Sequence, residues 1–349
     1  MKFENLIISE TATAKEALER LNDLADKTVS LFVADAEKKI TGSLTDGDIR
    51  RGFLQELKVT DVVSKFMNRS FNFISGENIS QEQLSHFKKN ALRFVPQLDA
   101  QHRLVKVVDV SLLKAILPVD VVIMAGGRGE RLKPLTDNTP KPLLEIGGKP
   151  IIERNIDRLA SFGVKNFFLS VNYLAEQIEK YFGDGAAKNI SMNYVHESNP
   201  LGTIGAAGTI NDFKNEFVLV LNSDLLTNID FEEFFLQFKN QNADFSIATI
   251  PYNVNVPYAI LELSDKSQIM SLKEKPTYTY FANAGIYLVK KNLLQLIPQG
   301  KKFDATDLIE LLIQENKKVV SFPILSYWLD IGNMDDYRRA QMDVLHLNF

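Results

Sequence analysis

The chain has 349 residues, roughly two domains in length, with 45% hydrophobic and 24% charged residues, a mix typical of a globular protein. It contains no cysteine, which excludes disulfide frameworks, thiolate metal sites and cysteine nucleophiles. A formal net charge of −4 argues against a protein that binds nucleic acid through a broad positive field. No apolar run approaches the about 20 residues of a membrane span, and the first residues lack a signal-peptide pattern. We therefore expect a cytoplasmic protein with no nucleic-acid or membrane partner.

Residues 1–117 contain one weak pattern twice, and we take them as the first domain. Capping-box sequences that predict the start of a helix begin at Thr13 and again at Ser80. The extended runs that follow these helices lie at 29–33, 40–44, 94–95 and 104–108. Two helix–strand–strand–helix units of this size seldom bury a good core singly, so we expect them to pack together as a pair.

Residues 119–349 form the second expected domain, in which apolar strands alternate with amphipathic helices. The expected strands lie at 121–124, 167–171, 217–221 and 245–250, and the expected helices at 152–159 and 174–181. This alternation predicts a mostly parallel α/β sheet with helices on both faces, and such sheets bind ligands at the carboxyl ends of their strands. The segment 259–275 predicts a hairpin with Asp265 and Lys266 at its turn.

The first strand of the second domain leads into a glycine-rich loop at 125–129, with Arg131 and Lys141 shortly after it. Glycines in such a place let backbone N–H groups approach a phosphate chain closely. The loop fits neither common phosphate motif: Leu132 stands where the dinucleotide pattern needs its third glycine, and Pro150 where the Walker pattern needs Ser or Thr. Glycines alone are equally consistent with a turn, and the two cations beside them favour a phosphate site.

The string from Met124 to Thr136, followed by Pro140-Lys-Pro142, resembles the signature of sugar-1-phosphate nucleotidyltransferases. The resemblance extends over residues 119–349. It implies a Rossmann-like, GT-A-like mixed sheet with helices on both faces, and an enzyme that joins a nucleoside triphosphate to a sugar-1-phosphate and releases pyrophosphate. It also implies that Arg131 and Lys141 are the catalytic residues.

The same resemblance assigns further residues to the substrates and to a metal. The implied nucleotide-binding residues are Ala125, Gly126, Gly127, Gly129, Glu197, Gly202 and Thr203. The implied sugar- and phosphate-binding residues are Glu274, Lys275, Asn283 and Gly285, from segments reading Glu274-Lys-Pro276 and Asn283-Ala-Gly-Ile-Tyr287. The implied ligands of Mg²⁺ are Asp224, in Asn222-Ser-Asp224, and Asp330, in Trp328-Leu-Asp-Ile-Gly332.

Elementary chemistry agrees with these assignments, because both substrates are polyanions that must be brought together. The fork-shaped cation of Arg131 suits a triphosphate, and Lys141 and Lys275 would place point charges on the phosphates. Mg²⁺ prefers one or two carboxylates together with phosphate oxygens and water, which fits Asp224 and Asp330. No general base is required, since the attacking phosphate is already ionised.

Each residue also has a plainer interpretation when it is taken by itself. Asp224 could end a strand or cap a helix, and Asp330 alone is equally weak. The segment 274–276 could be a turn, and Trp328 could be a core aromatic. Their occurrence together in the family's order is what favours the functional interpretation.

The choice of base depends on Glu197, which by the motif match lies where the family reads the nucleobase edge. Guanine presents two adjacent donors, and a carboxylate can accept from both. Uracil and thymine present one donor between two carbonyl oxygens, which a carboxylate repels. The sequence thus favours GTP over UTP and dTTP, with the alternative that Glu197 only caps backbone N–H groups of its loop.

In the first domain, the string from Gly42 to Arg51 resembles the end of a CBS motif, so residues 1–117 resemble a CBS pair. The resemblance implies an adenine nucleotide held by Thr45 and Asp48. The second copy, at 104–109, lacks the matching Gly and Thr. The alternative is a module that serves only dimerisation, and in either case we expect a homo-oligomer.

The sequence therefore predicts a guanylyltransferase that uses Mg²⁺, GTP and a mannose- or glucosamine-type sugar-1-phosphate to make precursors of surface glycans. Two alternatives stay open: a uridylyl- or thymidylyltransferase of the same family, and a non-catalytic regulator in which the CBS pair senses adenine nucleotides.

Overall fold

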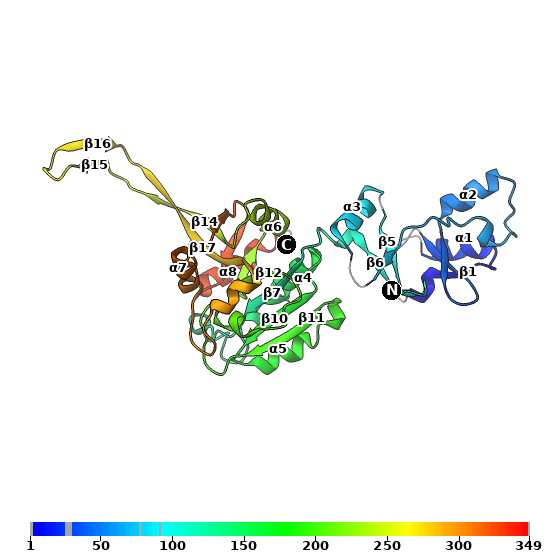
Figure 1. The fold of residues 1–349 in the computed structure, drawn as a ribbon, viewed down its shortest axis with the longest axis horizontal. Helices are drawn as coiled ribbons and strands as arrows, with labels where there is room; N and C mark the ends of the chain where they lie inside the picture. Colours follow the sequence, from blue (N-terminus) through cyan, green and yellow to red (C-terminus); the bar gives the residue numbers. More distant parts are fainter. Residues whose placement is uncertain (1–2, 25–29, 77–78, 91, 348–349) are drawn as a thin grey trace. The chain divides into compact units, whose positions relative to one another are not determined.

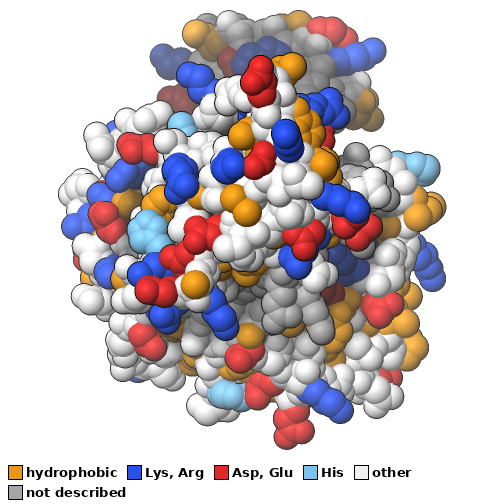
Figure 2. Space-filling view, turned by 90° about the vertical axis from the view of Figure 1, so that its right-hand side faces the viewer, with side chains coloured by type: hydrophobic (Ala, Val, Ile, Leu, Met, Phe, Trp, Pro, Cys, Tyr) orange, Lys and Arg blue, Asp and Glu red, His pale blue; other side chains and the backbone are white. Residues whose placement is uncertain are grey.

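The computed structural model describes residues 3–24, 30–76, 79–90 and 92–347, which divide into two compact units (Figure 1). Unit 1 comprises Met1–Ile116 and unit 2 comprises Leu117–Phe349. Within the described residues, no helix is long and apolar enough to cross a membrane. On the face shown in Figure 2, acidic and basic side chains are interspersed without a patch of one sign.

Unit 1 contains the predicted repeat as two small sheets of the same topology, β1-β2-β3 and β4-β5-β6. In each sheet the first strand is parallel to the second, and the second is antiparallel to the third. The first copy consists of β1 (Ile7–Ser9), α1 (Ala14–Asp23), β2 (Leu31–Ala34), β3 (Ile40–Leu44) and α2 (Asp46–Leu54). The second consists of β4 (Ile74–Ser75), α3 (Gln81–Lys89), β5 (Phe94–Leu98) and β6 (Leu104–Asp109).

Both predicted capping boxes form: the Thr13 side chain caps α1 and the Ser80 side chain caps α3. The predicted run at 29–33 is a strand from Leu31, while Val29 lies outside the described residues. The last helix expected in the second copy is wrong, because a short 3₁₀ turn, Val110–Leu112, stands there instead. Pro118 follows closely and limits the length that a helix could reach.

Unit 2 is built on a seven-stranded sheet in the order β11-β10-β7-β12-β17-β14-β18. Its strands are β7 (Val119–Met124), β10 (Asn166–Val171), β11 (Ser191–His196), β12 (Phe217–Asn222), β14 (Phe245–Asn255), β17 (Thr277–Lys290) and β18 (Val319–Pro323). Only β17 runs against its neighbours in this sheet, so the predicted mixed, mostly parallel α/β sheet is confirmed.

Helices cover both faces of this sheet because its strands are apolar on both sides. Val218 and Val220 point to a core shared with α7 (Ala305–Gln314). On the other face, Phe217 packs edge-on against the phenylalanines of α6 (Phe231–Asn240), and α4 (Ile151–Ser161) contacts α6 through Phe162 and Phe231. Helix α5 (Ala175–Phe182) packs beside β11.

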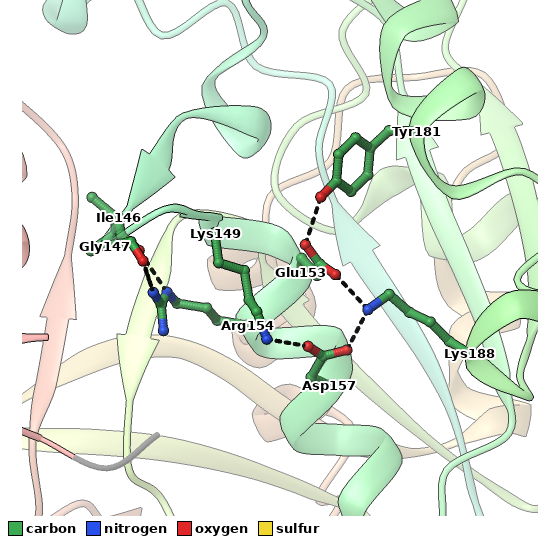
Figure 3. A network of polar contacts seen from close by, with 8 residues as sticks. All are labelled: Ile146, Gly147, Lys149, Glu153, Arg154, Asp157, Tyr181 and Lys188. Atoms are coloured by element: carbon green, nitrogen blue, oxygen red, sulfur yellow. Dashed lines mark hydrogen bonds and ion pairs between the residues drawn. The ribbon is translucent and has the colours of Figure 1, made fainter. Parts of the chain in front are cut away.

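A network of polar contacts ties α4 to the segments around it (Figure 3). Lys188 contacts Glu153 at 2.5 Å and Asp157 at 2.7 Å, and the Tyr181 hydroxyl donates to Glu153 at 2.7 Å. The hydrogen bond to Glu153 and burial raise the pKa of Tyr181 to about 12. Arg154 donates to backbone carbonyls in the turn between β8 (Glu145–Ile146) and β9 (Lys149–Pro150). The network fixes α4 against α5 and against this turn.

Strands β14 and β17 run on beyond the body of unit 2 as a two-stranded arm (Figure 1). The arm ends in the hairpin of β15 (Ile260–Leu263) and β16 (Ile269–Lys273), which confirms the hairpin predicted at 259–275. The strand predicted at 245–250 continues to Asn255, because residues 250–255 pair with 277–282.

Candidate active site at the carboxyl edge of the sheet

Backbone hydrogen bonds bring the ends of four parallel strands to one edge of the sheet. The amide of Ala125, after β7, donates to the carbonyl of Ser170 in β10 at 2.9 Å. The amide of Ser223, after β12, donates to the carbonyl of Met124 at 3.2 Å. The amide of Glu197, after β11, donates to the end of β10 at 3.0 Å. The glycine loop, the Glu197 segment and the Asp224 segment therefore all begin at this edge, as predicted for a ligand site.

Two glycines of the loop are required by close approaches. Gly129 has a φ of +65°, and a Cβ there would lie 2.9 Å from Thr136 and 3.0 Å from Lys141. A Cβ on Gly126 would lie 3.0 Å from an oxygen of Glu197. At Gly127 the space is open. The loop thus packs on Lys141 and Glu197 while its middle faces open space, where a phosphate chain could approach the backbone.

Lys141 and Asp224 form an ion pair, although they lie far apart in the sequence. Lys141 is 9% exposed, and its ammonium group donates to Oδ2 of Asp224. The position of Lys141 is set by a 3₁₀ turn, Lys141–Leu143, and that of Asp224 by the end of β12. The structure therefore joins a predicted catalytic residue to a predicted metal ligand.

Asp330 reaches the same place through a short antiparallel pair, β13 (Leu225–Thr227) with β19 (Trp328–Asp330). The amide of Ile331 donates to the carbonyl of Asp224 at 3.1 Å. Arg131 lies against Gly332, where a Cβ would be 3.3 Å from its guanidinium. A small core beneath these residues contains Leu132, Leu226, Leu329 and Ile331. Leu132, next to Arg131, and Leu329 and Ile331, on either side of Asp330, belong to that core. The backbone that carries Arg131 and Asp330 is therefore held in place by packing.

The carboxyl group of Asp330 is held in an unfavourable environment for its charge. Burial and the neighbouring Asp224 carboxylate raise the pKa of Asp330 to about 6, against the opposing influence of Lys141 and Arg131. Oδ1 of Asp224 and Oδ1 of Asp330 are buried and accept no hydrogen bond from the described residues. Unpartnered buried carboxylate oxygens are costly, and a divalent cation would satisfy both. In the described ranges, no group of three or more His, Cys, Asp or Glu side chains that could hold a metal occurs.

Glu197 is buried and has a structural role. The Ser170 hydroxyl donates to its Oε1, and the amide of Leu201 donates to its Oε2 at 2.8 Å. The capping alternative of the sequence analysis is thus present in the structure. Each carboxylate oxygen keeps a further lone pair, so base recognition by Glu197 stays a prediction.

Gly202 and Thr203 fasten their loop to the start of α7. A Cβ on Gly202, whose φ is +82°, would lie 2.6 Å from the carbonyl of Phe303. The amide of Thr203 donates to Asp304 at 2.9 Å, and its hydroxyl accepts from the amide of Ala305 at 2.8 Å. Asp304 also forms the capping box of α7 with Asp307, so a sequence signal marked it as a helix start but not as a partner of Thr203. A nucleotide contact by Gly202 or Thr203 stays a prediction.

Asn283 and Gly285 lie on β17 beside the end of β12. Asn283 accepts from the amide of Gly285 at 2.9 Å and donates to the Tyr287 hydroxyl at 2.8 Å. Gly285 has a φ of +71°, and a Cβ there would be 2.6 Å from the side chain of Asn222. Asn222 was not predicted as a site residue, although it belongs to the Asn222-Ser-Asp224 string that pointed to Asp224. The indole N–H of Trp328 donates to Ala284 at 3.0 Å, which supports the structural interpretation of Trp328.

Glu274 and Lys275 lie elsewhere, on the arm, and both are exposed. The extended strand from Gly285 to Lys275 measures roughly 30 Å at about 3.3 Å per residue. The structure does not place them beside Gly285, and their role toward sugar and phosphate stays a prediction.

In unit 1, Thr45 and Asp48 form the capping box of α2. The Thr45 hydroxyl donates to Asp48 at 2.6 Å and accepts from the Asp48 amide at 3.1 Å. Arg51 contacts the same carboxylate at 2.5 Å. The adenine-nucleotide role of Thr45 and Asp48 stays a prediction.

Comparison with known proteins identifies the family to which the second unit is similar. Residues 120–346 match the family model described as nucleotidyl transferase. The chain belongs to this family. The match does not reach residues 1–119, so the CBS pair stays a prediction.

Two relatives show how the similarity is distributed. The chain is 32% identical over 231 residues to D-glycero-alpha-D-manno-heptose 1-phosphate guanylyltransferase of Aneurinibacillus thermoaerophilus, covering 65% of this chain and 99% of the relative. It is 29% identical over 232 residues to mannose-1-phosphate guanylyltransferase of Mycobacterium tuberculosis, and spans 65% of that protein's length. Among solved structures, HddC from Yersinia pseudotuberculosis is 28% identical with a TM-score of 0.51, covering 65% of this chain and 99% of HddC.

Proposed function

We propose that unit 2 is a sugar-1-phosphate guanylyltransferase. It transfers the guanylyl group of GTP to a mannose- or glucosamine-type sugar-1-phosphate, releases pyrophosphate, and supplies nucleotide sugars for surface glycans. The observation that carries this proposal is the cluster of Lys141, Asp224 and Asp330 beside the glycine loop, with two buried carboxylate oxygens that lack a donor.

The reaction forms one bond between a phosphate oxygen of the sugar and the α-phosphorus of GTP, and breaks the bond from that phosphorus to the β-phosphate. Arg131 and the backbone of the glycine loop would bind the triphosphate and stabilise the charge that develops on the leaving pyrophosphate. Lys141 would orient Asp224 and neutralise phosphate charge. Asp224 and Asp330 would hold Mg²⁺, which when bound draws the phosphate oxygens together and makes the α-phosphorus more electrophilic.

The names of the relatives support the chemistry and leave base and sugar open. Two of the relatives described above are guanylyltransferases for mannose-type phosphates. A third, from Synechocystis, is a UTP–glucose-1-phosphate uridylyltransferase, 28% identical over 243 residues. Our preference for GTP rests on Glu197, whose carboxylate lies against Gly126 of the loop.

A matrix of substrates tests this proposal. The full-length chain, with Mg²⁺, is mixed with each of four nucleoside triphosphates and with the 1-phosphates of mannose, glucosamine, glucose and a manno-heptose, and pyrophosphate release is measured. We expect the highest kcat/KM with GTP and a manno-configured or glucosamine phosphate. Release only with UTP or dTTP would contradict the base assignment. A folded chain that releases pyrophosphate with no pair would support the regulatory alternative.

For unit 1 we propose that Thr45 and Asp48 bind one adenine nucleotide per chain. Support comes from the two sheets of equal topology and from the CBS-like string that places both residues at the start of α2. Calorimetry of the full-length chain with AMP, ADP and ATP tests it, and Thr45→Ala should abolish the heat. No heat with any nucleotide would leave dimerisation as the role of this unit.

A further inference from the structure

Arg128 is an exposed cation in the middle of the glycine loop, and the site as described above gives it no role. It follows Gly127, where a Cβ would meet nothing within 4 Å, so its side chain leaves the backbone beside the open part of the loop. Among the described residues, Arg128 forms no ion pair. Its charge is therefore available to a ligand that approaches the loop.

The ring of Tyr173 holds the side chain of Arg128 in place. The guanidinium carbon of Arg128 lies 5.8 Å from the centroid of this ring, within the range of a cation–π interaction. The Tyr173 hydroxyl donates to the carbonyls of Thr136 at 3.1 Å and Asp137 at 2.9 Å. Because the ring is fastened at its far end, it offers the guanidinium a fixed surface.

The backbone around Tyr173 is fixed as well. Leu174, the next residue, has a φ of +52°, a left-handed conformation that costs energy in a residue other than glycine and is typical of functional positions. Gln177, on α5, donates to the carbonyl of Asn138 at 3.0 Å. The connection from β10 to α5 thus clamps the segment 136–138 and presents the Tyr173 ring to Arg128.

The other cations near the loop each face a carboxylate of the chain. They are Lys133 with Glu130, Lys141 with Asp224, and Arg131 beside Asp330. Arg128 acts on Glu130 only through its charge, since the hydrogen bond to that carboxylate comes from Lys133. A triphosphate whose reacting α-phosphate lies at the aspartate pair still carries negative charge on its two terminal phosphates. Arg128 is the cation of the loop that can bind them without leaving a carboxylate unpaired.

The chemistry of Arg128 favours phosphate over the base. Arginine has only hydrogen-bond donors, so it cannot pair with the two donors that guanine presents to Glu197. Phosphate oxygens are acceptors, and the planar fork of a guanidinium can bind two of them at once. The connection from β10 to α5 carries neither Asp224 nor Asp330, so Arg128 reaches the part of the triphosphate that lies outside the aspartate pair.

We propose that Arg128 binds the β- and γ-phosphates of the nucleotide, which leave as pyrophosphate, and that Tyr173 is the residue that positions its guanidinium. The proposal rests on the function proposed above and adds a contact to the leaving group. Arg128 forms no covalent bond and transfers no proton. Its charge stabilises the charge that develops on pyrophosphate as the bond from the α-phosphorus to the bridging oxygen breaks.

Equilibrium binding tests the contact without turnover. The full-length chain is titrated with GTP or with GMP by calorimetry in the presence of Mg²⁺. Arg128→Ala should weaken the binding of GTP about tenfold or more and leave that of GMP unchanged, because GMP lacks both terminal phosphates. Arg338→Ala, at a 69% exposed arginine of the same unit, is the matched control and should change neither. Equal weakening of GTP and GMP, or an unchanged affinity for GTP, would overturn the proposal.

A double-mutant cycle tests the positioning role of Tyr173. Tyr173→Leu removes the ring, so it should weaken the binding of GTP about threefold or more, and the same substitution should have no effect when Arg128 is already alanine. Tyr173→Phe keeps the ring and loses the bonds to the two carbonyls, and it should show a smaller loss that is likewise absent in Arg128→Ala. Melting temperatures show whether each variant is folded. Equal losses with and without Arg128 would refute the positioning role.

The reverse reaction separates this proposal from the proposed function. With a nucleotide sugar and pyrophosphate as substrates, Arg128→Ala should raise the KM for pyrophosphate about tenfold or more and leave the KM for the nucleotide sugar unchanged. A rise in both values would overturn the proposal. If the wild type releases no pyrophosphate in the forward direction but its affinity for GTP depends on Arg128, the proposed function fails and the phosphate contact stands. Turnover by a wild type whose affinity for GTP is independent of Arg128 would have the opposite meaning.

Discussion

The carboxyl edge of the sheet and the arm both carry residues that we assign to substrate, but the fold holds them in opposite ways. At the edge, Lys141 is buried, ion-paired with Asp224, and flanked by a small apolar core. On the arm, Lys275 is exposed and lies on a ribbon whose strands pair only with each other in the described part of the chain.

The difference indicates that the two regions contribute to the site in different ways. Residues that bind the triphosphate and the metal must be preorganised, because their contribution to the rate depends on being in place before the reaction. Residues on the arm lie on a ribbon that pairs only with itself in the described part of the chain, so the body of the sheet does not fix their position directly. Substitutions at the edge should therefore cost more than equivalent substitutions on the arm.

The largest effect should follow from neutralising an aspartate at the edge. Asp224→Asn and Asp330→Asn keep the side-chain size and remove one charge, so kcat should fall by on the order of 10²-fold or more. Steady-state release of pyrophosphate measures this. Asp335→Asn, on the 91% exposed Asp335 of α8 (Met334–Asp343), is the control and should leave kcat unchanged. Near-normal turnover in either edge variant would refute the metal assignment.

The second effect concerns the base. Glu197→Gln retains an acceptor for the Leu201 amide but replaces one carboxylate oxygen by a donor, which suits uracil better than guanine. The ratio of kcat/KM for GTP to that for UTP should fall about 5- to 150-fold. This change corresponds to roughly 1–3 kcal/mol of discrimination between the two bases. An unchanged ratio would show that Glu197 only caps its loop.

The third effect compares two lysines of similar geometry. Lys188 is 28% exposed and contacts Glu153, which is 14% exposed; Lys273 on the arm contacts Glu262, and both are 51% exposed. Lys188→Met leaves the half-buried Glu153 without a cation, while Asp157 keeps its contact with Lys149, and it should lower the free energy of unfolding by about 1–3 kcal/mol. Lys273→Met, at an exposed ion pair, should leave it nearly unchanged. Urea denaturation measures both, and equal losses would contradict the contrast between body and arm.

The smallest effect is a gain in stability at the edge. Because the pKa of Asp330 is raised to about 6 from an unfolded value near 3.9, its contribution to stability is complete below about pH 4 and is lost as pH rises through about 6. In a chelator at pH 7, Asp330→Asn should therefore raise the free energy of unfolding by on the order of 1 kcal/mol, allowing for solvent screening of a partly exposed group. At pH 4 the gain should vanish, and an equal gain at both pH values would contradict this origin.

Local signals in the sequence predicted local structure well. Thr13 and Ser80 start their helices as capping boxes, and the apolar runs of unit 2 form the strands of one sheet. The arm was only half predicted, because the pairing of 250–255 with 277–282 is non-local.

At the site, the order of motifs indicated the residues but not their partners. The pairing of Lys141 with Asp224 depends on the whole sheet, so no spacing in the sequence could show it. The capping of the Leu201 amide by Glu197 was recognisable as an alternative. Asp304 could be recognised only as the start of α7, because its bond to Thr203 depends on the fold. The position of Lys275 depends on where a strand leaves the body, which a motif does not specify.

The fate of the α-phosphate of GTP shows directly whether unit 2 transfers a guanylyl group to a sugar-1-phosphate. The full-length chain is given Mg²⁺, a sugar-1-phosphate that supports turnover, and GTP radiolabelled on its α-phosphate. We expect the label to move into the nucleotide sugar while the released pyrophosphate is unlabelled, and we expect Asp224→Asn to abolish this transfer. Label that stays in GTP, or that appears in GDP or GMP without a sugar product, or equal transfer by the wild type and Asp224→Asn, would contradict it.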